Sequence, residues 1–179
     1  MGLLPGTRSH GQARSLTGLW EPLLAALKAL DGTGQDVIVD VGRLGLAGSP
    51  TALLHGADLA LVVCRSDLVS LSALRSWLAT LHTDLEEVGG ASSLGVVLVG
   101  PGHPYSEGEV GKVLGQVCGG RSPVLASLAW DPKAAAAFSA GAQVRRLESS
   151  RLVRSLRALD GATQRAVTGT AHDLTEVRA

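Results

Sequence analysis

The sequence predicts an α/β fold, a three-layer sandwich in which helices cover both faces of a mostly parallel sheet. Four nearly continuous apolar runs recur along the chain, as expected for strands that are buried on both faces. Helical patterns separate these runs, and strands that alternate with helices form parallel sheets. A chain of 179 residues with 45% hydrophobic residues is large and apolar enough to bury a core.

The predicted strands cover residues 37–41, 59–63, 95–99 and 124–129, with the stub of a further strand at Leu3 and Leu4. Asp40 lies near the carboxyl end of the first of the four, and the chain then turns at Gly42. Ligands of open α/β sheets bind at the carboxyl ends of the strands. Residues 36–43 are therefore the most informative segment of the chain.

The predicted helices cover residues 16–30, 70–85, a stretch that begins after Ser106, residues 132–141 and residues 149–167. Leucines spaced by three and four residues mark the second helix, and a capping-box pair, Ser106 and Glu109, marks the third. Pro132 suits the first turn of the fourth helix, and Gly141 its end. We expect the polar tail from Thr168 to fray. The predicted domains are an α/β domain over residues 1–147 and a C-terminal helix and tail over residues 148–179.

Composition narrows the class of protein. Aromatic residues make up only 3%, so the core must consist of aliphatic side chains. Sixteen basic and sixteen acidic residues cancel, so the global charge favours neither nucleic acid nor membrane. Cys64 and Cys118 lie in apolar runs, which predicts buried thiols. The sequence contains no apolar run of transmembrane length and no signal-peptide pattern, and we expect a cytoplasmic location.

Asp40 is the first candidate site residue. A carboxylate at the carboxyl end of a central strand can hold Mg²⁺, or waters of Mg²⁺, beside a phosphate. The pattern fits a strand-end aspartate that caps a loop equally well. Arg43 follows the turn, where its guanidinium suits a phosphate or a carboxylate of a partner subunit. A surface arginine paired with a neighbouring acid is an equally good interpretation.

The other predicted strands also end in candidate residues. Residues 65–67 follow the second strand, and Asp67 is best explained as a cap of the next helix. Residues 100–105 follow the third, where glycine allows the backbone to approach a planar ligand, although such a turn is common. Asp131 and Pro132 follow the fourth as the cap and first turn of a helix, and a ligand role would be additional.

The sequence lacks the groups that common catalytic sites need. It contains no G-x-x-x-x-G-K-[ST] phosphate loop, and none of Lys28, Lys112 and Lys133 lies in one. His103 has no histidine or cysteine partner at metal-ligand spacing, and no nucleophile elbow is present. We therefore expect no catalysis by the visible residues alone.

A local basic stripe lies in this neutral chain. Its members are Arg145, Arg146, Arg151, Arg154, Arg157 and Arg165, against Glu148 and Asp160. Such a stripe suits DNA phosphates or an acidic partner. A solvated helix face explains it with fewer assumptions, and no aromatic side chains are interleaved for stacking on bases.

The order of these segments resembles the later part of the ParA/MinD-like deviant-Walker ATPases, from about Leu3 to Leu159. The matching segments are residues 36–40, 56–63, 70–85, 95–100, 123–132 and 134–141. In turn they resemble the Walker B strand, the following a-D-x-h-h-h-V strand, the helix after it, the strand that usually ends in asparagine, the I-P-x-D loop and the A-x-x-x-G helix. Each match alone is weak, but their order and spacing are fairly specific.

This resemblance implies a P-loop NTPase-like fold. It would place Asp40 near magnesium through a water molecule, Arg43 at the switch II step, and Gly100, Asp131 and Pro132 near adenine. Mg-ATP is the implied cofactor if the missing phosphate loop is supplied elsewhere. The Asp-Val-Gly-Arg sequence that starts at Asp40 is closest to the D-x-P-R of the TadZ/CpaE branch, which helps to localise pilus and secretion machinery.

The chain also departs from the family pattern. The family's first strand, K-G-G-x-G-K-[ST] loop and first helix have no counterpart in this sequence, and Gly100 replaces the usual asparagine. The resemblance therefore implies a truncated coding sequence or a degenerate paralogue. An N-terminally truncated sheet would expose an edge or a face, which predicts a protein partner or self-association.

The sequence thus predicts a non-catalytic or nucleotide-binding-deficient scaffold or positioning protein, for a pilus, secretion or conjugation system. The alternative is a fragment or subunit of an active ATPase whose phosphate loop lies upstream or on another chain. A receiver-like phosphoacceptor domain that uses Asp40 is disfavoured, because the chain offers neither the acidic pair nor the lysine that such a domain needs.

Overall fold

The computed structural model describes residues 2–4, 6, 16–43, 49–87, 93–102 and 104–176, with side chains as far as residue 169. The chain divides into two compact units, Met1–Ala57 and Asp58–Ala179. The long C-terminal helix belongs to the second unit together with the sheet, while the predicted division at residue 147 stays a prediction.

The first unit contains a short 3-10 helix, η1 (Thr17–Leu19), and two helices, α2 (Trp20–Lys28) and α3 (Thr51–His55). The helix predicted over residues 16–30 is thereby confirmed, and Glu21 lies in its first turn, where an acid is favourable. The two helices contact one another, with the Leu24 side chain packed against the backbone of Gly56. The sequence pattern did not predict α3.

The strand predicted over residues 37–41 is wrong. Residues 35–42 form neither helix nor strand, and Ile38 is 97% exposed. The predicted stub at Leu3 and Leu4 is also wrong, since both side chains are exposed and lie outside any strand. A strand depends on the hydrogen bonds and packing of its neighbours more than on its own propensity, and no strand is described in the first unit.

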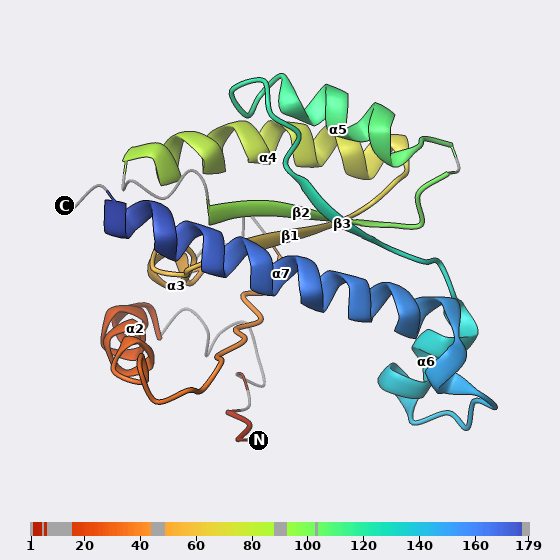
Figure 1. Cartoon of the computed structure of the whole chain (residues 1–179), viewed down its shortest axis with the longest axis horizontal. Coiled ribbons are helices and arrows are strands. Elements are labelled where there is room, and N and C mark those ends of the chain that lie inside the picture. Colours follow the sequence, from red (N-terminus) through yellow and green to blue (C-terminus); the bar gives the residue numbers. More distant parts are fainter. Residues whose placement is uncertain are drawn as a thin grey trace. The chain divides into compact units, whose positions relative to one another are not determined.

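The second unit is an α/β structure built on a three-stranded parallel sheet (Figure 1). Its strands are β1 (Ala60–Arg65), β2 (Leu94–Val99) and β3 (Val124–Leu128), in the order β1-β2-β3. The last three predicted strands are confirmed to within two residues. The central strand is the most buried, which accounts for its continuous apolar sequence.

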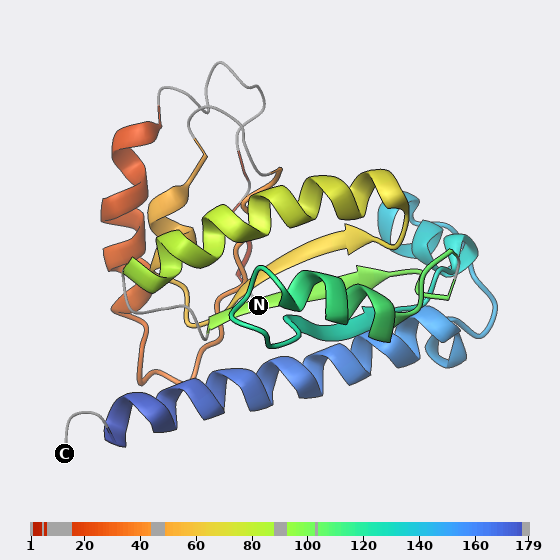
Figure 2. The same cartoon turned by 90° about the horizontal axis from the view of Figure 1, so that it is seen from above.

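Helices flank this sheet on either side (Figures 1 and 2). On one side lie α4 (Leu68–Glu87) and α5 (Glu107–Gly115), and on the other α7 (Arg151–Glu176) runs along β3. Between β3 and α7 the chain forms α6 (Pro132–Ala140) and the 3-10 helix η3 (Leu147–Ser149). All four predicted helices of this unit are present. The last continues to Glu176, beyond its predicted end at residue 167.

The core of the second unit is aliphatic, as the composition predicted. Leu78 and Leu85 of α4 are almost fully buried, as are Val96 and Leu98 of β2. Cys64 and Cys118 are buried free thiols, as predicted. Burial, with the nearby Asp67 carboxylate, raises the pKa of Cys64 to about 11. None of the helices in the described part of the chain has the length and apolar character needed to cross a membrane.

Candidate functional site

The carboxyl edge of the sheet is where α4, α5 and α6 begin, because each helix directly follows a strand. Each of these helix N-termini is capped by the chain's own side chains. The N–H of Ser70 donates to Asp67 Oδ1 at 2.9 Å, and the Ser70 hydroxyl donates to Asp67 Oδ2 at 2.8 Å. Asp67 is therefore the cap of α4, as the sequence favoured over a ligand role.

The other two helix N-termini are capped by further carboxylates. Ser106 and Glu109 form the predicted capping box at α5, in which Glu109 Oε2 accepts the Ser106 N–H at 2.9 Å. Asp131 Oδ1 accepts the Ala134 N–H at 3.1 Å, and Pro132 is the first residue of α6. Asp131 and Pro132 thus hold the structural positions predicted for them, and their predicted contact with adenine stays a prediction.

These caps place negative charge at the carboxyl edge of the sheet, the edge where open α/β sheets bind their ligands. Hydrogen bonds from the backbone and side chain of Ser70 lower the pKa of Asp67. The hydroxyl and N–H of Ser106 likewise lower the pKa of Glu109. Both carboxylates are therefore ionised at neutral pH. They already satisfy N–H donors that an incoming anion would otherwise use.

A second cluster at the same edge joins the ends of all three strands. The Arg65 guanidinium lies over the Trp130 ring, 5.0 Å from its centroid, and both residues are exposed. The Ser66 hydroxyl donates to the Gly100 carbonyl oxygen. Gly100 has φ +71°, and a Cβ atom there would lie 3.3 Å from Trp130 Cβ. The sequence predicts that glycine in this turn lets the backbone approach a planar ligand. In the structure the backbone of Gly100 lies against Trp130 of the same chain, a contact that sequence spacing did not reveal.

Asp40 and Arg43 belong to the first unit. Asp40 is exposed and accepts a hydrogen bond from the Gly42 N–H at 2.9 Å, so it stabilises the turn at Gly42. It does not end a strand, which removes the geometric reason for a magnesium role, and the loop-capping alternative fits the contacts. Arg43 is exposed, and its predicted phosphate contact stays a prediction. His103 lies outside the described residues.

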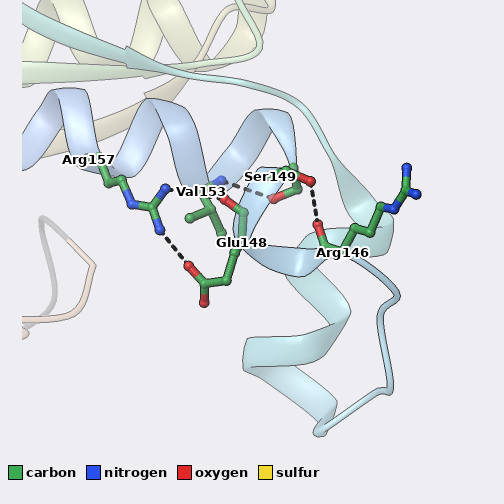
Figure 3. Close-up of polar contacts among 6 residues, drawn as sticks. Arg146, Glu148, Ser149, Val153 and Arg157 are labelled. Atoms are coloured by element: carbon green, nitrogen blue, oxygen red, sulfur yellow. Dashed lines mark hydrogen bonds and ion pairs between the residues drawn. The ribbon is translucent and has the colours of Figure 1, made fainter.

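The arginine stripe lies on and before α7. Arg145, Arg146, Arg151, Arg154 and Arg157 are all exposed. Figure 3 shows the Arg157 guanidinium directed at Glu148, with Nη2 2.5 Å from Oε2. Such an exposed ion pair contributes at most about 1 kcal/mol. It does neutralise part of the stripe, whose predicted contact with DNA stays a prediction.

One further concave feature of the second unit is an apolar groove of about 200 Å³ between α4 and α5. Its walls include Leu68, Leu71, Val113 and Tyr105. Of the candidate residues 100–105, Tyr105 lines this groove, whereas Gly100, Asp131, Pro132, Asp40 and Arg43 do not. The described residues also include no group of three histidine, cysteine, aspartate or glutamate side chains that could hold a metal ion.

The candidate site is thus a sheet edge whose helix N-termini are occupied by acidic caps and whose strand ends are joined by an Arg65–Trp130 stack. Sequence reasoning found the caps through their spacing before the helices. It missed the stack, because the two residues are 65 positions apart in the chain. No family model, curated protein or solved structure matches the chain.

Proposed function

We propose that this chain is a non-catalytic, ParA/MinD-like scaffold or positioning protein that does not bind nucleotide by itself. The proposal joins two kinds of support. The order of segments resembles that ATPase family, with a Walker B-like segment and the strands and helices that follow it. The parallel α/β architecture of the second unit is compatible with the later part of a P-loop NTPase-like fold.

The observation that carries the proposal is the acidic capping of α4, α5 and α6. A helix N-terminus binds phosphate through free N–H groups and its partial positive charge. Here Asp67, Glu109 and Asp131 supply carboxylates to those positions. A phosphate at this edge would lose hydrogen-bond donors and meet like charge within a few ångströms, so nucleotide binding is unfavourable.

The role of Asp40 agrees with the same proposal. In a phosphoryl-transfer site the corresponding aspartate is held at a strand end, where it orients magnesium. Asp40 instead lies in an exposed loop and bonds the Gly42 N–H. A protein that keeps the layout of an ATPase without its phosphate chemistry is suited to holding partners in place, for example in pilus, secretion or conjugation machinery.

The proposal is tested by measuring phosphate release from Mg-ATP with the purified chain, its Asp40→Asn variant and its Asp36→Asn variant. Asp36 is the matched control, since it is an exposed acid of the same loop. We expect all three proteins to release phosphate no faster than buffer. Magnesium-dependent release that Asp40→Asn abolishes and Asp36→Asn preserves would overturn the proposal.

A further inference from the structure

The outer edge of β1 is open within the described part of the chain, since β1 is the first strand in the order β1-β2-β3. The Ser66 N–H donates to the Val99 oxygen of β2 at 3.2 Å. Because backbone groups alternate along a strand, those of Leu61, Val63 and Arg65 point to the open edge. The Arg65 oxygen accepts a hydrogen bond from the Cys64 thiol at 3.1 Å, which is a weak donor and leaves the edge accessible.

The side chains of this edge are also exposed on one face. Val63 is 64% exposed, and Arg65 follows it on the same face of the strand. Ala60, Val62 and Cys64 point to the opposite, buried face. An open strand with an exposed valine is a template for pairing with another strand.

Residues 36–41 have the complementary character. Their sequence, Asp-Val-Ile-Val-Asp-Val, is rich in β-branched residues, which favour strands. The segment nevertheless belongs to no strand, with Ile38 97%, Val37 44% and Val39 42% exposed. The turn at Gly42, held by Asp40, ends it. Burying an exposed apolar segment of this kind lowers the free energy of the protein.

We propose that residues 36–41 of one copy add as a parallel strand to the open edge of β1 in a second copy. A single register satisfies both sets of side chains. With Ile38 beside Val63, Asp40 lies beside Arg65, and Val37 and Val39 join the buried face of β1. The added strand covers the exposed apolar atoms and pairs a carboxylate with a guanidinium.

A second copy is the occupant because every copy carries both halves of the contact. The open edge offers backbone donors and acceptors with an apolar centre and a positive carboxyl end, and residues 36–41 offer an apolar centre and a negative carboxyl end. The parallel direction continues the sheet, in which all described strand pairs are parallel. The contact involves no nucleotide and stands independently of the proposed function.

The first test is sedimentation of the full chain over a concentration series. We expect self-association that Ile38→Asp weakens by about 10- to 100-fold in dissociation constant, the range expected for losing one buried isoleucine. Val69→Asp is the matched control, because Val69 is an 80% exposed apolar residue of helix α4 and belongs to neither of the two strands proposed to pair. A chain that stays monomeric at all concentrations, or equal weakening by both substitutions, would overturn the proposal.

Charge substitutions test the direction of the strand. In the parallel register Asp40→Arg faces Arg65 and weakens association, and combining it with Arg65→Asp restores association. Asp36→Arg has little effect on association in the parallel register. In an antiparallel addition Asp36 would lie beside Arg65, so Asp36→Arg would weaken association and Asp40→Arg would have little effect. That outcome would contradict the parallel register.

Cross-linking identifies the occupant. One chain carries Ile38→Cys, and a second chain, with a tag of different length, carries Val63→Cys. The native thiols are buried and Cys64 has a raised pKa, so they react slowly and are left in place. We expect mild oxidation to give the mixed-size disulfide, which Val37→Cys in place of Ile38→Cys does not give. A chain that carries both Ile38→Cys and Val63→Cys reports a contact within one copy. If only this chain forms the disulfide, residues 36–41 pair with β1 of the same copy and the proposal fails.

Discussion

Gly100 holds the turn between β2 and α5 in a backbone conformation that side chains rarely adopt. Its φ is +71°, and the Cβ of Trp130 leaves little room for a methyl group. Because Gly100 has no side chain, Trp130 can lie against the backbone of this turn.

Replacing Gly100 with alanine should therefore destabilise the protein. We expect a loss of about 1–2 kcal/mol in the free energy of unfolding, from the left-handed φ and the contact with Trp130. Gly108→Ala is the matched control, since Gly108 lies in α5 with open space around its Cα. That substitution should be neutral or slightly stabilising in urea denaturation. Equal losses in both variants would contradict this role of Gly100.

Asp67 gives a prediction for pH. Its pKa is lowered in the folded chain, so its contribution to stability is complete above its ordinary pKa of 3.8 and is lost as pH falls through the lower folded value. Asp67→Ser keeps a capping oxygen without the charge. Between pH 5 and pH 3 its urea midpoint should fall less than that of the wild-type chain. Glu87→Gln, at the other end of α4, should keep the wild-type acid dependence, and an equal fall in the Asp67→Ser variant would refute the assignment.

Among the helices and strands, α4 contributes four buried leucines to the core. Its buried leucines are Leu74, Leu78, Leu81 and Leu85, spaced by three and four residues as the sequence predicted. Leu78 has no exposed surface, whereas Leu68 at the start of the helix is 62% exposed. The same helix therefore provides a buried and an exposed leucine for comparison.

Leu78→Ala should lower the free energy of unfolding by about 2–5 kcal/mol, because it removes buried methyl groups and leaves a cavity. Leu68→Ala should cost less than about 1 kcal/mol, since its side chain is already largely in water. Chemical denaturation of both variants checks the difference. Similar losses would mean that α4 does not pack against the sheet as described.

Sequence periodicity predicted these elements where local pattern and tertiary packing agree. Leucine spacing gave α4, and the capping residues gave the starts of α5 and α6, because a cap is a local interaction between residues three apart. The strand over residues 37–41 failed for the opposite reason. A strand requires neighbours, and nothing in that segment shows whether a neighbouring strand is present.

At the scale of the whole chain, the candidate residues fall in two units. Gly100, Asp131 and Pro132 belong to the second unit, and Asp40 and Arg43 to the first. The sequence placed them in one site by assigning each to the carboxyl end of a predicted strand, an arrangement that the family resemblance also implies. Residues 37–41 form no strand, so this reason does not hold for Asp40 and Arg43. At the carboxyl edge of its sheet the second unit brings together the Arg65–Trp130 stack and three acidic helix caps.

We propose that this edge does not accept a nucleotide, and calorimetric titration of the full chain with Mg-ATP measures such binding directly. The acidic caps and the exposed position of Asp40 predict no saturable heat at millimolar nucleotide. Saturable binding of one Mg-ATP per chain at micromolar concentration would show that the chain binds nucleotide and would refute the proposed function.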